Sequence, residues 1–407
     1  MTLAERIIAA HANRDRVEPG ELVTVQVDRV YLQDGNSPTI RKLFAENGFT
    51  EVFDSSRIGV FFDHSVLAPD VKIADRLREA EEFAEKLGLC IFKAGTGISH
   101  VVALEEGWFE PGTIVVGSDS HTCTGGALQC LALGMGASDI VAAMVTGKTW
   151  LRVPETVWIE TCGIPQQCTR AKDVMLYTLL KLRQEPFLYK SIEWSGNWLD
   201  TLSLDAKATI ANMAVELGAK CSFLPPSQEN RESLAPIQMP AEGDPRRFRL
   251  DISGLPPFVA KPHSPSNAVP LDECRGEKIN YVFIGSCTNS RLEDIAEVAG
   301  VFAREKVHSR VHCLVTPGSQ NVYLEALRLG YVETIVRAGA IVTPPGCGAC
   351  LGTQGTIPAS GDRILSTMNR NFLGRMGNPK ADIWLASPLV AAHTAIHGEI
   401  PKTGDLS

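Results

Sequence analysis

Short apolar runs rich in β-branched residues alternate with helical patterns along the first part of the chain. Strands are predicted at residues 22–27, 57–62 and 112–116. Between the last two strands, apolar side chains recur at spacings of three and four, which predicts a helix with one buried face, formed by Ile73, Leu77, Ala80, Ala84 and Leu87. This alternation favours the α/β class, in which helices cover buried and largely parallel sheets.

The last part of the chain shows the same alternation. Strands are predicted at residues 280–284 and 340–343, and each runs into a turn that contains cysteine. Ser290 is predicted to cap the helix after the first of these turns, because it directly precedes a helical apolar pattern at Leu292, Ile295, Val298 and Phe302.

Two stretches indicate boundaries between domains. Residues 224–247 are polar and rich in turn formers. Residues 255–271 contain prolines that exclude a regular helix or a central strand, at Pro256, Pro257, Pro262, Pro265 and Pro270. We therefore expect an N-terminal α/β domain at 1–162, a middle α/β domain with a Pro-rich connector at 163–270, and a C-terminal α/β domain at 271–407.

Composition narrows the class of protein. The 407 residues are 44% hydrophobic and 21% charged, which is typical of an α/β protein in solution. The net charge of −8 argues against nucleic acid or an anionic membrane as the main partner. No run of 18 apolar residues occurs, and the first ten residues read as a helix and not as a signal peptide. Eleven cysteines are too dilute for a disulfide scaffold, so we expect a reducing cytoplasm.

Three cysteines lie in turns rich in glycine, proline and serine. Cys287 follows the strand at 280–284, and Cys347 and Cys350 follow the strand at 340–343. Three thiolates are one fewer than a cubane iron–sulfur cluster usually takes, so one iron would stay open as a Lewis acid. A Cys-x-x-Cys pair alone suits a zinc ion or a redox pair equally well. The third cysteine favours the cluster.

Side chains that exchange protons follow predicted strands or the glycine-rich stretch at 94–99; they are Asp63, His64, His100, Asp119 and His121. The ligand crevice of an open α/β sheet lies at the carboxyl ends of its strands, so we expect these side chains to converge. An adjacent aspartate fixes the tautomer of a histidine and keeps a proton available. Any one of these histidines alone is more often an ordinary core or surface residue.

Two further groups of polar side chains are candidates for the site. Arg370 and Arg375 lie in a turn rich in glycine and asparagine, and guanidinium forks bind carboxylates well. Asn212 and Glu216 stand four residues apart in the helical pattern at 210–217, so they share one face. The ordinary alternatives are a surface salt bridge for the arginines and a solvated helix face for the other pair.

Together these motifs resemble the aconitase superfamily, and within it the large subunits of two-subunit isopropylmalate isomerases. The similarity spans nearly the whole chain in the family's order. The segments that carry it are DRVYLQD (28–34), DH (63–64), GISH (97–100), GSDSHT (117–122), ANMAVELG (211–218), GSCTNS (285–290), GCGAC (346–350) and NRNFLGR (369–375). The segments 125–130 and 183–194 depart from the family's pattern, which leaves the exact substrate open.

The resemblance implies a three-domain α/β fold around a [4Fe–4S] cluster bound by Cys287, Cys347 and Cys350, without the family's fourth, swivelling domain. It implies a hydro-lyase that reversibly dehydrates and hydrates, or isomerises, a hydroxy-dicarboxylic acid through a cis-unsaturated intermediate. The implied roles are protonation of the departing hydroxyl by His64 with Asp63, ordering of water by His100, Asp119, His121 and Glu216, and substrate binding by Gln33, Ser120, Asn212, Arg370 and Arg375.

The resemblance also implies a partner. The chain ends shortly after the expected third domain, so a small subunit carrying the swivelling domain and a serine base is expected, in a heterodimer or heterotetramer. The expected substrate is 3-isopropylmalate or a related malate derivative, in amino-acid biosynthesis. The alternatives are 2-methylmalate, dimethylmalate, maleate-type acids and homoaconitate. A zinc or redox protein without catalytic activity is the alternative from another class, but it leaves the acid–base and arginine motifs unexplained.

Overall fold

The computed structural model describes residues 1–227 and 235–406, and within them the strands form four sheets. The first sheet is parallel, with the strand order β4-β3-β2-β5-β6. Its strands are β2 (Arg29–Gln33), β3 (Ile58–Phe61), β4 (Cys90–Phe92), β5 (Ile114–Gly117) and β6 (Leu131–Gly134). The helices of this region are α1 (Leu3–His11), α2 (Ser37–Glu46), α3 (Val71–Leu87), α4 (Ser99–Glu105) and α5 (Ala137–Thr146), with 3-10 helices η1 (Ser55–Arg57) and η2 (Ser120–Leu128).

The second sheet is also parallel, with the order β10-β9-β8-β11. Its strands are β8 (Thr156–Cys162), β9 (Ser191–Ser195), β10 (Cys221–Phe223) and β11 (Arg247–Asp251). The helices of this region are α6 (Ala171–Leu182), α7 (Asn197–Asp200), α8 (Leu204–Met213) and η3 (Ala214–Leu217). A separate antiparallel ribbon pairs β1 (Leu22–Gln26) with β7 (Lys148–Arg152).

The third sheet has the order β13-β12-β18-β17-β14-β15-β16. Its strands are β12 (Phe258–Ala260), β13 (Ala268–Pro270), β14 (Tyr281–Ile284), β15 (His312–Val315), β16 (Ile341–Val342), β17 (Arg363–Ser366) and β18 (Asp382–Leu385). Strands β14 to β18 are parallel, whereas β12 and β13 join antiparallel. The helices are α9 (Leu292–Phe302), α10 (Gln320–Arg328), α11 (Tyr331–Arg337) and α12 (Pro388–His397), with η4 (Leu271–Cys274), η5 (Gly348–Cys350) and η6 (Thr403–Asp405).

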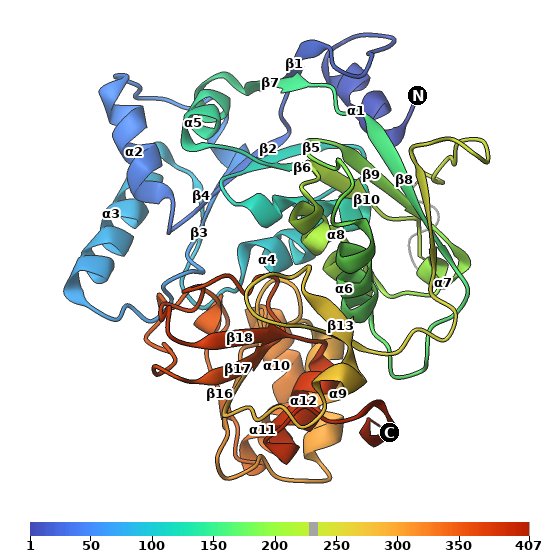
Figure 1. The fold of residues 1–407 in the computed structure, drawn as a ribbon. Coiled ribbons are helices and arrows are strands. Elements are labelled where there is room, and N and C mark those ends of the chain that lie inside the picture. Colours follow the sequence, from blue (N-terminus) through green and yellow to red (C-terminus); the bar gives the residue numbers. More distant parts are fainter. Residues whose placement is uncertain (228–234, 407) are drawn as a thin grey trace.

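The three large sheets share part of one hydrophobic core. A single cluster of buried side chains contains Ala127 of η2, Met175 of α6 and Phe283 of β14, and it reaches the three predicted cluster cysteines. In Figure 1 the third sheet and its helices, gold to red, lie on one side of this junction and the first two sheets lie on the other. The cysteine turns are therefore placed where the three parts of the molecule meet.

The α/β class predicted from the hydrophobic pattern is confirmed, with sheets that are mostly parallel. The helix expected around Ile73–Leu87 is α3, and the strands expected at 57–62 and 280–284 are β3 and β14. The division at residues 162 and 270 stays a prediction; β8, which ends at the first of these, pairs into the second sheet. No helix in the described ranges combines the length and apolar character needed to cross a membrane.

Two local predictions were wrong. The proline-rich stretch contains β12, which lies between β13 and β18 in the third sheet and not in an extended connector. Pro257 and Pro262 flank this short strand, so neither removes one of its N–H groups. The cap of α9 is Arg291 and not Ser290, and the backbone N–H of Arg291 donates to Asp294 in the first turn of the helix at 3.0 Å.

Candidate functional site

The predicted site residues meet where several parallel strands end. Gln33 is the last residue of β2, Asp63 lies two residues after β3, and Asp119 lies two residues after β5. Cys287 lies three residues after β14 in the third sheet. Carboxyl ends of parallel strands line a common edge, which accounts for the convergence. Each predicted residue contacts at least one other member of the set, through the interactions described below.

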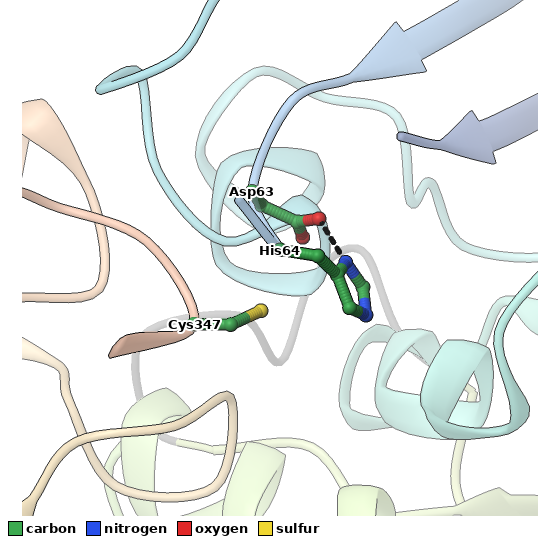
Figure 2. Close-up of side chains that lie close together, drawn as sticks. All are labelled: Asp63, His64 and Cys347. Atoms are coloured by element: carbon green, nitrogen blue, oxygen red, sulfur yellow. Dashed lines mark hydrogen bonds and ion pairs between the residues drawn. The ribbon is translucent and has the colours of Figure 1, made fainter. Parts of the chain in front are cut away.

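Asp63 and His64 form a closely bonded pair beside one of the cysteine turns. Asp63 Oδ1 lies 2.6 Å from His64 Nδ1, and Asp63 Oδ2 accepts the backbone N–H of Ser99 at 2.7 Å. Gln33 Nε2 donates to Ser99 Oγ at 2.6 Å and contacts Asp63 Oδ2 at 3.5 Å. The backbone N–H of Cys347 donates to the carbonyl of Asp63. Figure 2 shows the Cys347 side chain beside the Asp63–His64 pair. The Cys347 sulfur, a carboxylate oxygen of Asp63 and a ring nitrogen of His64 lie within 4.8 Å of one another.

Asp34 completes this acid–base group, although sequence reasoning did not single it out. Its carboxylate accepts the backbone N–H groups of His64 and Ser65, both at 3.0 Å, and lies 3.4 Å from His64 Nδ1. Burial favours the neutral ring, but the attraction of Asp63 and Asp34 is stronger and raises the pKa of His64 well above its ordinary value. Because Nδ1 faces both carboxylates, Nε2 is the nitrogen available to a ligand.

A second chain of hydrogen bonds runs through the other two histidines. Asp119 caps η2 by accepting the backbone N–H of His121 at 2.7 Å. The same carboxylate oxygen lies 3.0 Å from His100 Nε2, and His121 Nε2 lies 3.1 Å from Glu216 Oε1. Glu216 also accepts Arg370 Nε at 2.7 Å. This chain therefore connects residues of the first, second and third sheet regions.

Ser120 joins the chain because Arg370 Nη1 donates to its hydroxyl at 3.2 Å. Burial opposes the ionised form of Asp119, yet hydrogen bonds from His100 and His121 hold the pKa of Asp119 well below its usual range. Burial also lowers the pKa of His121, but Asp119 and Glu216 raise it above the ordinary value. The group thus combines an ionised carboxylate with histidines that can donate.

Amide and guanidinium N–H groups surround the cysteine sulfurs. Asn212 Nδ2 lies 3.2 Å from Cys287 Sγ, and Asn369 Nδ2 lies 3.3 Å from the same sulfur. Arg375 Nη2 lies 3.3 Å from Cys350 Sγ. Asn212 is the penultimate residue of α8, while Glu216 lies in the 3-10 turn that follows, so the predicted α-helical pattern ends earlier than expected although both side chains face the site.

The three thiols suit a metal centre. All are free and buried. Burial and the neighbouring Cys350 sulfur raise the pKa of Cys287 to about 11, and burial with Asp63 raises the pKa of Cys347 well above its ordinary value. Burial works against the thiolate of Cys350 too, but Arg375 lowers its pKa below the ordinary value. A positively charged metal centre would stabilise all three as thiolates, and N–H donors to sulfur are common around iron–sulfur clusters.

Among the site residues predicted from the sequence, two buried polar atoms have no partner in the described part of the chain. They are Gln33 Oε1 and Arg375 Nε. Buried polar groups are normally hydrogen-bonded, so atoms of this kind in a cluster of acid–base side chains indicate a place for a polar ligand. The free N–H of Arg375 suits a carboxylate and the free Oε1 of Gln33 suits a hydroxyl, so together the two atoms fit a hydroxy acid.

Sequence reasoning also missed side chains that hold the cysteine turns. Arg291 is buried and donates to the carbonyls of Cys287 and Thr288, both at 3.0 Å. Asn369 precedes the predicted Arg370 and bonds Cys287, as described above. Asp34 directly follows Gln33 at the end of β2, so the strand-end argument that found Asp63 would have found it. The role of Arg291 had no such signal, because it depends on backbone carbonyls.

Comparison with known proteins supports one family. The sequence model of the aconitase family, described as aconitate hydratase, matches residues 5–244 and 270–398. The 3-isopropylmalate dehydratase large subunit of Halothermothrix orenii is 41% identical, with 98% of this chain and 98% of that protein covered. A large subunit of the same name from Pyrococcus furiosus is 40% identical over 98% of this chain and 97% of its own. The probable methanogen homoaconitase large subunit of Methanothermobacter thermautotrophicus is 40% identical with the same coverage.

A solved structure shows the same fold at much lower sequence identity. The holo form of Thermococcus kodakaraensis aconitase X superposes with a TM-score of 0.57, covering 86% of this chain and 84% of that chain at 14% identity. At this identity the likeness concerns the fold alone.

Proposed function

The chain belongs to the aconitase family of hydro-lyases, and we propose that it is the cluster-binding subunit of a two-subunit enzyme that acts on a hydroxy-dicarboxylic acid. The observation that carries the proposal is the meeting of Cys287, Cys347 and Cys350 with the Asp63–His64 pair at one junction. The names of the similar relatives favour 3-isopropylmalate as the substrate. Homoaconitate is the second candidate, because a homoaconitase large subunit is about equally similar.

The three cysteines are proposed to hold a [4Fe–4S] cluster. When bound, such a cluster supplies one iron without a cysteine ligand as a Lewis acid toward oxygen. The proposal is supported by the burial of the thiols and by the amide and guanidinium donors that face them. Members of the family generally carry this cluster.

Proton transfer is proposed to start from His64. Hydroxide is a poor leaving group, so its departure requires a proton from a placed acid. Asp63 and Asp34 hold Nδ1 and favour the protonated ring, which leaves Nε2–H to donate to the departing hydroxyl. His100, Asp119, His121 and Glu216 are proposed to orient the water that leaves and returns.

Substrate carboxylates are proposed to bind to the partnerless Nε–H of Arg375 and the nearby donors, while Gln33 Oε1 accepts from a substrate hydroxyl. Arg375 offers Nε, and Arg370 is held in place by Glu216 and Ser120. Gln33 and Asn212 complete the polar lining, with Asn212 also bonded to Cys287. The fixed fork of a guanidinium matches the geometry of a planar carboxylate.

A small subunit is proposed as the partner. The relatives are named large subunits, and such a name implies a smaller one. We propose that it carries a swivelling domain, closes over the site, excludes water and supplies the serine base that removes the carbon-bound proton. The isolated chain is then expected to be inactive.

The test uses anaerobically purified protein with and without the small subunit. We expect iron and sulfide in the wild type, loss of visible absorbance in C287S, C347S and C350S, and turnover of isopropylmalate or homoaconitate only in the assembled enzyme. C313S is the matched control, because Cys313 is equally buried but lies on β15. Stoichiometric zinc without sulfide, or turnover of neither acid by the assembled enzyme, would contradict the proposal.

A further inference from the structure

A buried tyrosine and threonine lie behind His100, on the side away from Asp119. Tyr31 is a fully buried residue of β2, and its hydroxyl lies 2.7 Å from His100 Nδ1. The same hydroxyl lies 3.0 Å from Thr122 Oγ1. Neither side chain has a part in the proposed reaction. Their hydrogen bonds nevertheless decide whether Nδ1 of His100 carries a hydrogen.

The direction of these hydrogen bonds follows from counting protons. Thr122 Oγ1 lies 2.6 Å from the backbone carbonyl of Asp119, which can only accept, so the single hydroxyl proton of Thr122 points there. The Thr122 oxygen therefore accepts the proton of Tyr31. With that proton engaged, the Tyr31 oxygen can only accept from His100, and Nδ1 must carry a hydrogen.

The packing around the two hydroxyls leaves them little freedom. The Tyr31 ring packs edge-on against Phe61 and Phe109, with ring centroids 5.4 Å and 6.2 Å apart. At Gly117 an added Cβ would lie 2.5 Å from Thr122 Oγ1 and 2.7 Å from Tyr31 Cζ. Glycine at this position therefore leaves the space in which the two side chains meet. The hydrogen-bond chain is part of the packed core.

We propose that Tyr31 and Thr122 are positioning residues that keep a hydrogen on Nδ1 of His100. They keep Nδ1 protonated, so that Nε2, which faces Asp119 at 3.0 Å, is the only nitrogen that gains or loses a proton. The consequence for turnover rests on the proposed function, since a hydro-lyase needs His100 to exchange protons toward Asp119 and the reacting water. The hydrogen on Nδ1 follows from the hydrogen bonds of Tyr31 and Thr122 alone, whether or not Nε2 also donates to Asp119.

The tautomer can be measured directly in the full chain. Histidine labelled with nitrogen-15 gives separate Nδ1 and Nε2 signals, and the His100 signals are assigned by their loss in H100Q. We expect a protonated Nδ1 in the wild type. In T122V the threonine acceptor is gone, so the Tyr31 proton turns to His100 and Nδ1 loses its hydrogen. T122S keeps the hydroxyl and is expected to restore the wild-type signals.

Y31F provides a second variant should T122V fail to fold. It removes the acceptor of Nδ1–H, so the neutral ring is expected to carry its proton on Nε2 toward Asp119. Y281F is the matched control, because it removes another buried tyrosine hydroxyl, which donates to the Thr356 carbonyl. A wild-type ring with a bare Nδ1, or unchanged His100 signals in both T122V and Y31F, would overturn the proposal.

Kinetics of the assembled enzyme separate this proposal from the proposed function. We expect kcat to fall about 10- to 100-fold in T122V, the range seen when the hydrogen-bond partner that orients a functional histidine is removed, with KM little changed and with recovery in T122S. If the wild type turns over no hydroxy acid, the proposed function fails while the nitrogen signals still decide the tautomer. If turnover is normal and the Nδ1 signal shows no attached hydrogen, only the proposal about His100 fails.

Discussion

At the scale of single residues, the site is built from pairs in which one side chain sets the charge or tautomer of the other. Asp63 and Asp34 favour protonated His64, while the histidines around Asp119 favour its ionised form. Arg375 does the same for the Cys350 thiolate. Since these groups are buried or partly buried, the pairings act in a lower dielectric than pairs on the surface and are therefore stronger.

The D63N variant tests the first of these pairs. Removing the negative charge beside Nδ1 lowers the pKa of His64, so less of the acid form is present at neutral pH. We expect kcat of the assembled enzyme to fall by about 100-fold or more, with the basic limb of its pH profile shifted to lower pH. Visible absorbance of the cluster is expected to remain. An unchanged basic limb would contradict the role of His64.

H263Q is the matched control for this variant. His263 lies 3.5 Å from Asp382, but both side chains are about half exposed, and exposed pairs contribute little. Its removal is expected to leave kcat and the pH profile unchanged.

Most of the candidate site was predictable at this scale because its residues carry unusual chemistry in short motifs. Asp63–His64, Asp119–His121 and the cysteine turns are recognisable without coordinates. Tyr31 was not, because a tyrosine in a strand reads as a core residue. Its role depends on a contact with His100, 69 residues away, that only the fold brings about.

At the scale of elements, strand ends were easier to predict than caps and short strands. The apolar runs of β3 and β14 have clear boundaries, and the chemistry follows them directly. β12 has only three residues between prolines, so its pattern is too short to show a period. The α9 cap was missed because Ser290, with the stronger intrinsic preference, stands one residue too early.

Alanine substitutions at Gly126 and Gly300 are expected to change the free energy of unfolding in opposite directions. A Cβ on Gly126 would lie 1.5 Å from the backbone oxygen of Ser222 in β10, so η2 and the second sheet would have to separate. G126A is expected to lose about 3 kcal/mol or more of the free energy of unfolding. Nothing lies within 4 Å of a Cβ on Gly300 in α9, so G300A is expected to gain about 0.5–1 kcal/mol.

Urea unfolding of both glycine variants, followed by circular dichroism, measures these changes. A free energy of unfolding in G126A that equals or exceeds that of the wild type would show that η2 does not pack on β10 as described.

The contact between α1 and the first sheet predicts a pH dependence of stability. His11 Nε2 lies 2.8 Å from Asp28 Oδ2, and Asp28 also accepts the N–H of Ile114 in β5. The hydrogen bond to Asp28 raises the pKa of His11 in the folded state. Burial works against the ionised form of Asp28, but His11 and Ile114 lower its pKa below the ordinary value.

The sign follows for each group. The contribution of His11 is full below its unfolded pKa of about 6.5 and is lost as pH rises through the raised folded value. The contribution of Asp28 is full above about pH 3.9 and is lost as pH falls through its lowered folded value. H11Q is therefore expected to lower the thermal midpoint near pH 5.5 and to have less effect at pH 8.5. Because the pair is half exposed, the difference is expected to stay below about 1 kcal/mol.

At the scale of the whole molecule, the site exists only where three sheets meet, so the contacts between them matter as much as its own residues. Lys172 of α6 is fully buried, and its Nζ donates to the carbonyl of Met368 at 2.6 Å and to that of Thr367. Burial lowers the pKa of Lys172 to about 7. These carbonyls follow β17 of the third sheet and precede Asn369 and Arg370.

Replacing Lys172 therefore tests whether the junction positions the chemistry. K172M leaves two buried carbonyls without their donor, which is expected to cost about 1–3 kcal/mol of stability. It also frees the turn before Asn369 and Arg370, so kcat of the assembled enzyme is expected to fall. K220M is the matched control: Lys220 Nζ donates to one carbonyl, that of Gly134, at 2.8 Å. It is expected to lose stability while kcat is retained. Equal kcat in both variants would show that the α6 contact holds the fold without positioning the site.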